Sequence, residues 1–116
     1  MVQRFLLVIL LAMSLNGCTS TAPLSEGTLD SPNPAARLYA IRRAGQQGDR
    51  SMIPKLVELL DSSDPTERLL VIQSLEHITG SRLDYVPYAN PQQREAAIAR
   101  WVDAVNTRKF AASSQP

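Results

Sequence analysis

Asp64-Pro65-Thr66-Glu67-Arg68-Leu69-Leu70-Val71-Ile72 is the stretch that decides the fold of this chain. Aspartate followed by proline is a typical helix start, because the carboxylate accepts hydrogen bonds from free backbone N–H groups and proline suits the first helical position. The same opening occurs 31 residues earlier at Asn33-Pro34, and the matched positions continue as Arg37 with Arg68, Leu38 with Leu69 and Ile41 with Ile72. A helical unit that recurs at such a period buries its apolar face by stacking on neighbours. The sequence therefore predicts a stack of repeated helices.

Apolar spacing places four helices around these openings. We predict them at 34–44, 50–60, 65–78 and from 91 to about 108, the last opened by a third Asn-Pro pair at 90–91. Gly45 is expected to end the first helix in a left-handed conformation, and Gly80 the third. The expected buried faces are Leu38, Ile41 and Ala44; Ile53, Leu56, Val57 and Leu60; Leu69, Val71, Ile72, Leu75 and Ile78; and Ile98, Trp101, Val102 and Val105.

Together with Pro54 inside Met52–Leu60, the stretch Pro34–Gly80 resembles a short bacterial HEAT-like repeat. The segment that ends in the 91–101 helix looks like the closing unit of some bacterial HEAT-repeat proteins. The resemblance implies an all-α fold of two stacked antiparallel helix pairs, a truncated HEAT-like α-solenoid that covers residues 34–108. Residues 109–116 are expected to form a frayed tail.

The N-terminal residues have the order of a secretory signal. A basic start at Arg4 precedes the apolar run Phe5–Leu15, and the small residue Gly17 precedes Cys18, the only cysteine. Eleven helical residues span roughly 16 Å, about half of the hydrocarbon core of a bilayer, so the run is too short for a comfortable membrane span. We therefore expect residues 1–17 to be removed.

Leu15-Asn16-Gly17-Cys18 resembles the lipobox of a bacterial lipoprotein, although Asn16 departs from its usual small or hydroxyl residue. The resemblance implies cleavage before Cys18, diacylglycerol on its sulfur and acylation of the new amino terminus, which together anchor the protein to a membrane. Lipidation also accounts for a lone cysteine in an exported chain. An ordinary secretory signal followed by a free cysteine, or an uncleaved anchor, would be the alternatives. Thr19 is not the aspartate that resembles an inner-membrane retention signal, which favours the outer membrane, facing the periplasm.

Residues 18–33 are rich in small polar residues, proline and glycine and lack apolar periodicity, so we predict a lipidated, flexible linker. Without residues 1–17 the chain loses one charged side chain, Arg4, and its formal net charge falls from +1 to 0. A neutral chain has no general electrostatic attraction to nucleic acid. We expect no nucleic-acid partner.

The sequence offers no catalytic, cofactor or metal site. His77 is the only histidine and Cys18 is assigned to lipid, which argues against zinc. Asp61, Asp64 and Glu67 are interpreted as capping and first-turn charges rather than paired catalytic carboxylates. We therefore expect no cofactor and no enzymatic activity.

Tyr85 and Tyr88 lie in the ten-residue connection before the last helix and have two interpretations. They could fill a gap between helices, which we favour, or they could be exposed anchors for a protein partner, because tyrosine is enriched in interface hot spots. Trp101 lies on an apolar stripe and is expected to be buried, with its indole N–H bonded to the connection's backbone.

These observations favour a membrane-anchored, periplasm-facing lipoprotein of the bacterial envelope that acts as a non-enzymatic protein-binding or scaffold module. Two alternatives remain open at this point. One is a small enzyme-related domain, since HEAT-like repeats also occur in proteins resembling phycobilin lyases. The other is a structural stabiliser of a membrane complex.

Overall fold

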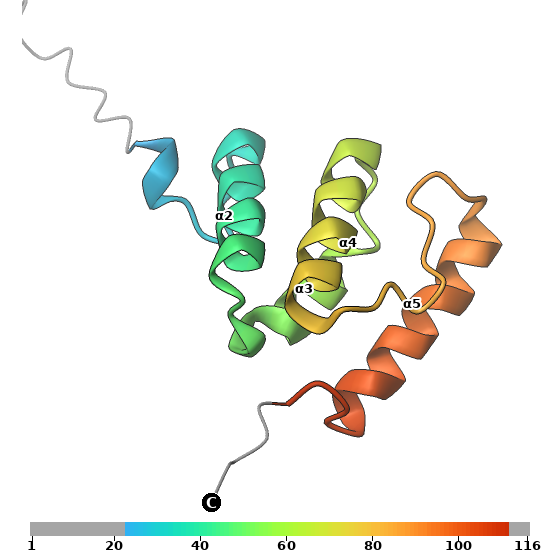
Figure 1. The fold of residues 1–116 in the computed structure, drawn as a ribbon. Coiled ribbons are helices and arrows are strands. Elements are labelled where there is room, and N and C mark those ends of the chain that lie inside the picture. The colour runs from blue at the N-terminus through green and yellow to red at the C-terminus, as the bar shows by residue number, and fades with distance from the viewer. Residues whose placement is uncertain (1–22, 112–116) are drawn as a thin grey trace, which may run out of the picture.

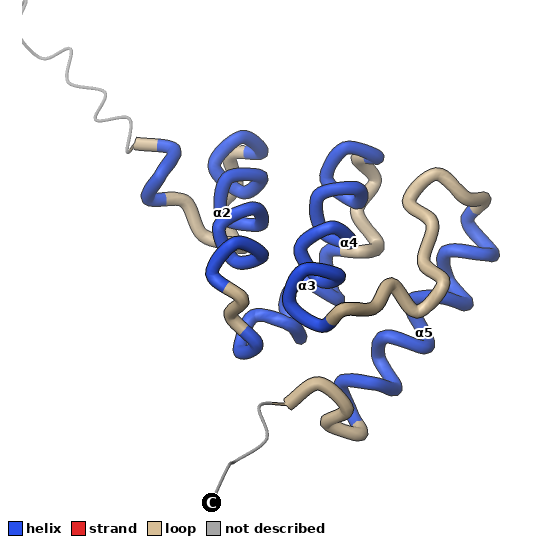
Figure 2. Tube along the Cα trace, in the orientation of Figure 1, coloured by secondary structure: helices blue, strands red, loops and turns tan. Residues whose placement is uncertain are grey.

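The computed structural model describes residues 23–111 of the chain. Its elements are η2 (Leu24–Glu26), α2 (Pro34–Gln47), η3 (Arg50–Met52), α3 (Ile53–Leu59), α4 (Pro65–Thr79) and α5 (Pro91–Asn106). Figures 1 and 2 show four α-helices and, between residues 23 and 111, no strand. The predicted all-α, HEAT-like fold is confirmed. None of the helices in this range is both long enough and apolar enough to cross a membrane.

The three Asn-Pro and Asp-Pro openings begin helices as predicted. In each case the side-chain oxygen of the capping residue, Asn33, Asp64 or Asn90, accepts a hydrogen bond of 2.9–3.0 Å from a backbone N–H two or three residues later. Proline then occupies the first helical turn, where its missing N–H has no intrahelical partner to lose. The repeated opening thus sets where α2, α4 and α5 start.

The predicted end of the first helix was wrong. Gly45 lies inside α2, and Gly48, with φ +62°, is the left-handed residue that caps it. Gly45 is needed for another reason: a Cβ there would lie 2.6 Å from the hydroxyl oxygen of Ser74 in α4. The Ser74 hydroxyl donates to the carbonyl of Ile41 at 2.9 Å. The glycine therefore permits a close helix contact.

The predicted helix 50–60 is split into two parts. Residues 50–52 form the short η3 turn, and α3 proper begins at Ile53, with Pro54 in its first turn. The carboxylate of Asp49 accepts from the backbone N–H of Ser51 and so caps η3. The turn reverses the chain after α2 and leads α3 back along the stack.

The helices form two layers, α2 with α4 and α3 with α5. α2 packs against α4, and α3 packs against both α4 and α5. In Figure 1, α2 and α4 run in the same direction, α3 runs the opposite way, and α5 descends at a slant in the same general direction as α4. The 81–90 connection makes the return path between α4 and α5. The α4–α5 unit therefore departs from a regular antiparallel helix pair, because an irregular segment takes the place of the returning helix.

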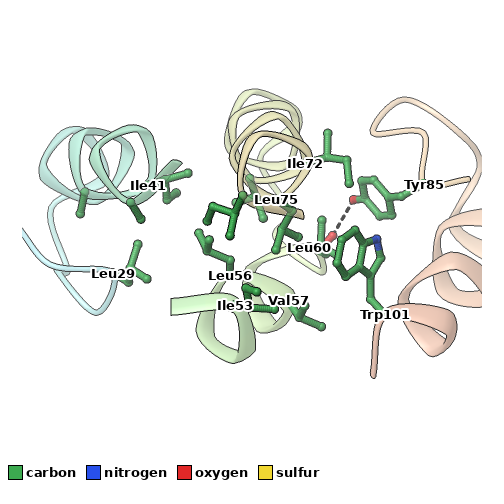
Figure 3. Close-up of a cluster of buried hydrophobic side chains, with 14 of the residues drawn as sticks. Leu29, Ile41, Ile53, Leu56, Val57, Leu60, Ile72, Leu75, Tyr85 and Trp101 are labelled. Carbon is green, nitrogen blue, oxygen red and sulfur yellow. Dashed lines mark hydrogen bonds between the residues drawn. The ribbon is translucent and has the colours of Figure 1, made fainter. Parts of the chain in front are cut away.

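One apolar cluster joins the two layers (Figure 3). Its fully buried side chains include Ile41, Leu56, Leu60, Ile72 and Leu75, together with Val71, Tyr85 and Trp101. The buried face of α5 is Ala97, Trp101 and Ala104, whereas Val102 is 44% exposed. The predicted burial of Trp101 is confirmed, and the prediction for Val102 was wrong. The helix is rotated so that two alanines, rather than valine, lie closest to its neighbours.

The part of the predicted flexible linker that the structure describes is docked on α2. Leu29 belongs to the buried cluster, with 7% of its surface exposed. A Cβ at Gly27 would lie 2.5 Å from the carbonyl oxygen of Ala36, so glycine allows the segment to approach the helix closely. The Arg43 guanidinium donates to the carbonyls of Ser25 and Gly27. Residues 23–33 therefore cover the outer side of α2. Residues 1–22, with Cys18, lie outside the described range.

We predicted a frayed tail at residues 109–116, and this was wrong for residues 109–111, the part of the tail that the structure describes. Phe110 packs on Trp101, with ring centroids 5.5 Å apart, and Arg50 donates to the carbonyl of Phe110 at 2.8 Å. These contacts hold residues 107–111 against the stack. Residues 112–116 lie beyond the described range.

The arginine that follows each helix start bonds backwards to the preceding loop. The Nη1 atoms of Arg37, Arg68 and Arg94 donate to carbonyls five or six residues earlier, at 2.7–2.9 Å. Arg37 and Arg68 also reach forward: Arg37 to Glu67 of α4, and Arg68 to the carbonyl of Pro87. The arginine that recurs in the sequence repeat therefore joins its helix to the loop before it, and in the first two repeats it also joins that helix to the unit that follows.

Glu67 has a larger role than the first-turn charge we predicted. Its side chain is 2% exposed, and its two carboxylate oxygens accept three hydrogen bonds of 2.8–3.0 Å from Arg37. Hydrogen bonding to this carboxylate raises the pKa of the Arg37 guanidinium above its ordinary value. The pair fixes α2 to α4 at the end where both helices begin.

Candidate functional site

Tyr85 is part of the core. Only 1% of its surface is exposed, and its hydroxyl donates to the carbonyl of Leu60 at 2.7 Å (Figure 3). Burial raises the pKa of the phenol, against the opposing effect of the nearby Arg68 and Arg94 charges. The gap-filling interpretation is confirmed for this tyrosine, and its candidacy as an exposed partner anchor was wrong.

Tyr88 is exposed over 66% of its surface, and Val86 over 53%. Burial alternates along this stretch: Tyr85 and Pro87 are buried, whereas Val86 and Tyr88 are exposed. The Ala89 N–H donates to the carbonyl of Val86 at 3.1 Å, so residues 86–89 form a turn. The sequence reasoning missed Val86, because Tyr85-Val86-Pro87-Tyr88 is apolar throughout and carries no alternation that separates exposed from buried positions. Val86 and Tyr88 together form the exposed apolar face of the 81–90 segment, which we call the 86/88 face.

Side chains of the neighbouring helices hold the backbone of the 81–90 segment. Trp101 Nε1 donates to the carbonyl of Arg82 at 3.0 Å, as predicted for its indole, and Arg100 Nε donates to that of Leu83 at 2.9 Å. Leu83 and Asp84 both have left-handed φ angles, +48° and +61°. Non-glycine residues reach this region at some cost, so surrounding contacts must fix it. The two bonds from α5 supply such contacts.

On the other side, Arg68 Nε donates to the carbonyl of Pro87 at 3.0 Å, between the two exposed residues. Arg68 itself is 6% exposed. The 86/88 face is therefore presented by a segment bonded to α4 and α5 and to the end of α3 through Tyr85. Such a surface loses little conformational freedom when a partner binds.

The family model for HEAT repeats matches residues 21–99. The chain belongs to the HEAT-repeat family. HEAT repeats are generally protein-interaction and scaffold modules. No curated protein and no solved structure matches this HEAT-repeat chain. The matched range takes in α2, α3, α4, the 81–90 segment and the first half of α5.

The other residues that the sequence analysis considered for chemistry in this HEAT-repeat protein are not gathered in one place. His77 is exposed in the last turn of α4. Asp64 caps α4, and Glu67 pairs with Arg37. Within residues 23–111 no group of three or more histidine, cysteine, aspartate or glutamate side chains is arranged to hold a metal ion. In the same range, every buried side-chain nitrogen and oxygen has a hydrogen-bond partner.

Proposed function

We propose that this HEAT-repeat protein is a non-enzymatic protein-binding module and that the 86/88 face contacts its partner. The observation that carries the proposal is the pairing of a 66% exposed tyrosine with an exposed valine on a segment whose backbone carbonyls accept four hydrogen bonds from side chains of α4 and α5. Tyrosine supplies a large, partly apolar contact area, and interface hot spots are enriched in it. Membership of a family of interaction modules supports the same function.

The second part of the proposal concerns the membrane. We propose that Cys18 carries lipid and tethers the stack to the bacterial envelope, facing the periplasm, with the outer membrane favoured over the inner. The support is the order of a basic start, an apolar run and Gly17-Cys18, together with the lack of a second cysteine. At least two acyl chains are needed for stable anchoring, and the implied modification supplies them.

Site-specific photocrosslinking in intact cells tests the partner surface. A photoreactive phenylalanine analogue replaces Tyr88, and in a matched control it replaces Tyr39, which is 50% exposed on α2. We expect a discrete crosslinked species for position 88 and none of that mass for position 39. Equal crosslinking at both positions, or none at position 88, would contradict the proposal.

The anchor is tested by the intact mass of membrane-extracted protein beside a Cys18→Ala variant. We expect a species that begins at Cys18 and is heavier by diacylglycerol and an acyl chain, and that is absent from the variant. An unmodified mass would refute the anchor without affecting the partner surface.

A further inference from the structure

A cavity of about 300 Å³ lies between the start of α3 and the end of α5. Its inner wall is apolar and includes Ile53, Ala104, Val105 and Phe110, of which Ile53 and Ala104 are buried. Its rim carries two exposed guanidinium groups, Arg50 from η3 and Arg108 from the turn that follows α5. The cavity thus combines a small hydrocarbon-lined interior with a positive entrance.

Neither rim arginine is neutralised by the part of the chain that the structure describes. Arg50 donates one hydrogen bond, to the carbonyl of Phe110, and the Arg108 side chain donates none among residues 23–111. In that range neither forms an ion pair. The neighbouring carboxylate of Asp49 accepts from the N–H and the hydroxyl of Ser51 through Oδ1, and within the described residues it forms no ion pair with either arginine. The ammonium of Lys109, 5.5 Å from the centroid of the Phe110 ring, adds a third cation nearby.

We infer that this cavity binds a carboxylate carried on a short apolar group. A guanidinium presents donors in a planar fork that matches a carboxylate, and the two arginines leave most of their donors free. The apolar wall would bury the attached hydrocarbon, and the volume is at the lower end of the range for ligand cavities. The ligand is therefore a small apolar acid or the C-terminal residue of another chain, which share this chemistry.

The inference does not depend on the 86/88 face. α5 has sixteen residues and is about 24 Å long, and the cavity lies at its C-terminal end whereas the 81–90 segment precedes its N-terminus. Variants at one place leave the other unchanged, so the two proposals can fail separately.

The test is a titration of the isotopically labelled chain from residue 18 to residue 116, the form left after the proposed removal of residues 1–17, followed by amide NMR shifts. The two acidic probes are hexanoate and acetyl-Gly-Gly-Phe with a free C-terminus. Their neutral controls are hexanol and the same peptide as its C-terminal amide. We expect saturable shifts around Ile53, Ala104 and Phe110 for an acid, much weaker shifts for its neutral control, and weaker binding as salt rises from about 0.05 to 0.5 M.

Three variants assign the shifts to the rim. Arg50→Gln and Arg108→Gln remove one charge each while keeping most of the side chain, and we expect each to weaken binding by about 5-fold or more. Arg42→Gln is the matched control, because Arg42 is an exposed arginine on α2 that does not line this cavity, and it should leave binding unchanged. Should Arg50→Gln also shift residues 107–111, Arg108→Gln still tests the inference.

Binding of the peptide acid alone would identify the C-terminus of a protein chain as the source, and binding of hexanoate alone would identify a free acid. Both outcomes support the inference. It is overturned if neither acid binds at the cavity, if the neutral controls bind as tightly as the acids, or if Arg42→Gln weakens binding as much as Arg108→Gln.

Discussion

Replacing Glu67 by glutamine tests whether the buried pair with Arg37 fixes α2 to α4. The substitution keeps the size of the side chain but removes its charge, and one of the two acceptor oxygens becomes an NH₂ donor that faces the guanidinium. At least one of the three hydrogen bonds from Arg37 is therefore lost. The Glu67 side chain is 2% exposed, so water cannot replace the lost bonds there.

The magnitude follows from the burial of the two partners. Breaking a fully buried ion pair costs about 3–5 kcal/mol, but the Arg37 side chain is 23% exposed and stays partly hydrated. A hydrogen bond to a charged group contributes about 1.5–3 kcal/mol, so we expect Glu67→Gln to lower the free energy of unfolding by about 2 kcal/mol. For a domain of this size that corresponds to a fall in melting temperature of about 8–16 °C.

Urea and thermal unfolding, followed by far-ultraviolet circular dichroism, measure this loss. The matched control is Glu76→Gln, because Glu76 pairs with Arg82 at 2.6 Å but the two side chains are 46% and 39% exposed. An exposed pair contributes at most about 1 kcal/mol. If Glu67→Gln lowers the free energy of unfolding no more than Glu76→Gln does, then burial does not make the Arg37–Glu67 pair stronger than an exposed pair, and the reasoning is refuted.

Three further substitutions test other contacts. Gly45→Ala should destabilise the fold by about 1–3 kcal/mol in urea unfolding, because its methyl group would overlap Ser74, although alanine is the better helix former; a neutral or stabilising effect would contradict the close contact. Tyr85→Phe should cost about 1 kcal/mol at neutral pH. Burial raises the pKa of Tyr85, so the phenol loses its proton in the unfolded chain before it does so in the folded one. The contribution of Tyr85 to stability is therefore fully present below about pH 10 and is lost as the pH rises above it. Unfolding midpoints measured toward about pH 11 should fall less in the variant than in the wild type. Leu29→Ala should weaken the docked segment by about 1–2 kcal/mol, seen as faster limited proteolysis of residues 24–33, and unchanged proteolysis would show that Leu29 does not hold it.

The starts of the helices could be predicted from the sequence because capping is local. Each start depends on one side-chain oxygen and one proline, and both act on backbone groups within three residues. The end of α2 could not be assigned in the same way. Gly45 and Gly48 are both plausible caps from the sequence, and only the contact with Ser74, far along the chain, shows that the glycine at position 45 serves helix packing rather than helix termination.

The candidate site was predicted in part. The sequence drew attention to Tyr85 and Tyr88 but could not separate them, since which tyrosine points inward depends on the carbonyl of Leu60 and on donors from α4 and α5. The docked segment was missed because it is held by Leu29 and by the Arg43 hydrogen bonds, with Gly27 permitting the close approach, and these contacts give no periodic pattern. Glu67 was assigned a local role because its partner lies 30 residues away.

The docking of residues 24–33 on α2 has a mechanical consequence. The chain enters the stack through this segment, so a force that pulls on the N-terminal side is borne first by the two Arg43 hydrogen bonds and by Leu29. These few contacts yield at a lower load than the four helices, whose core is shared among many side chains. Under tension residues 24–33 would detach first and lengthen the connection that leads into α2, while the four helices stay folded.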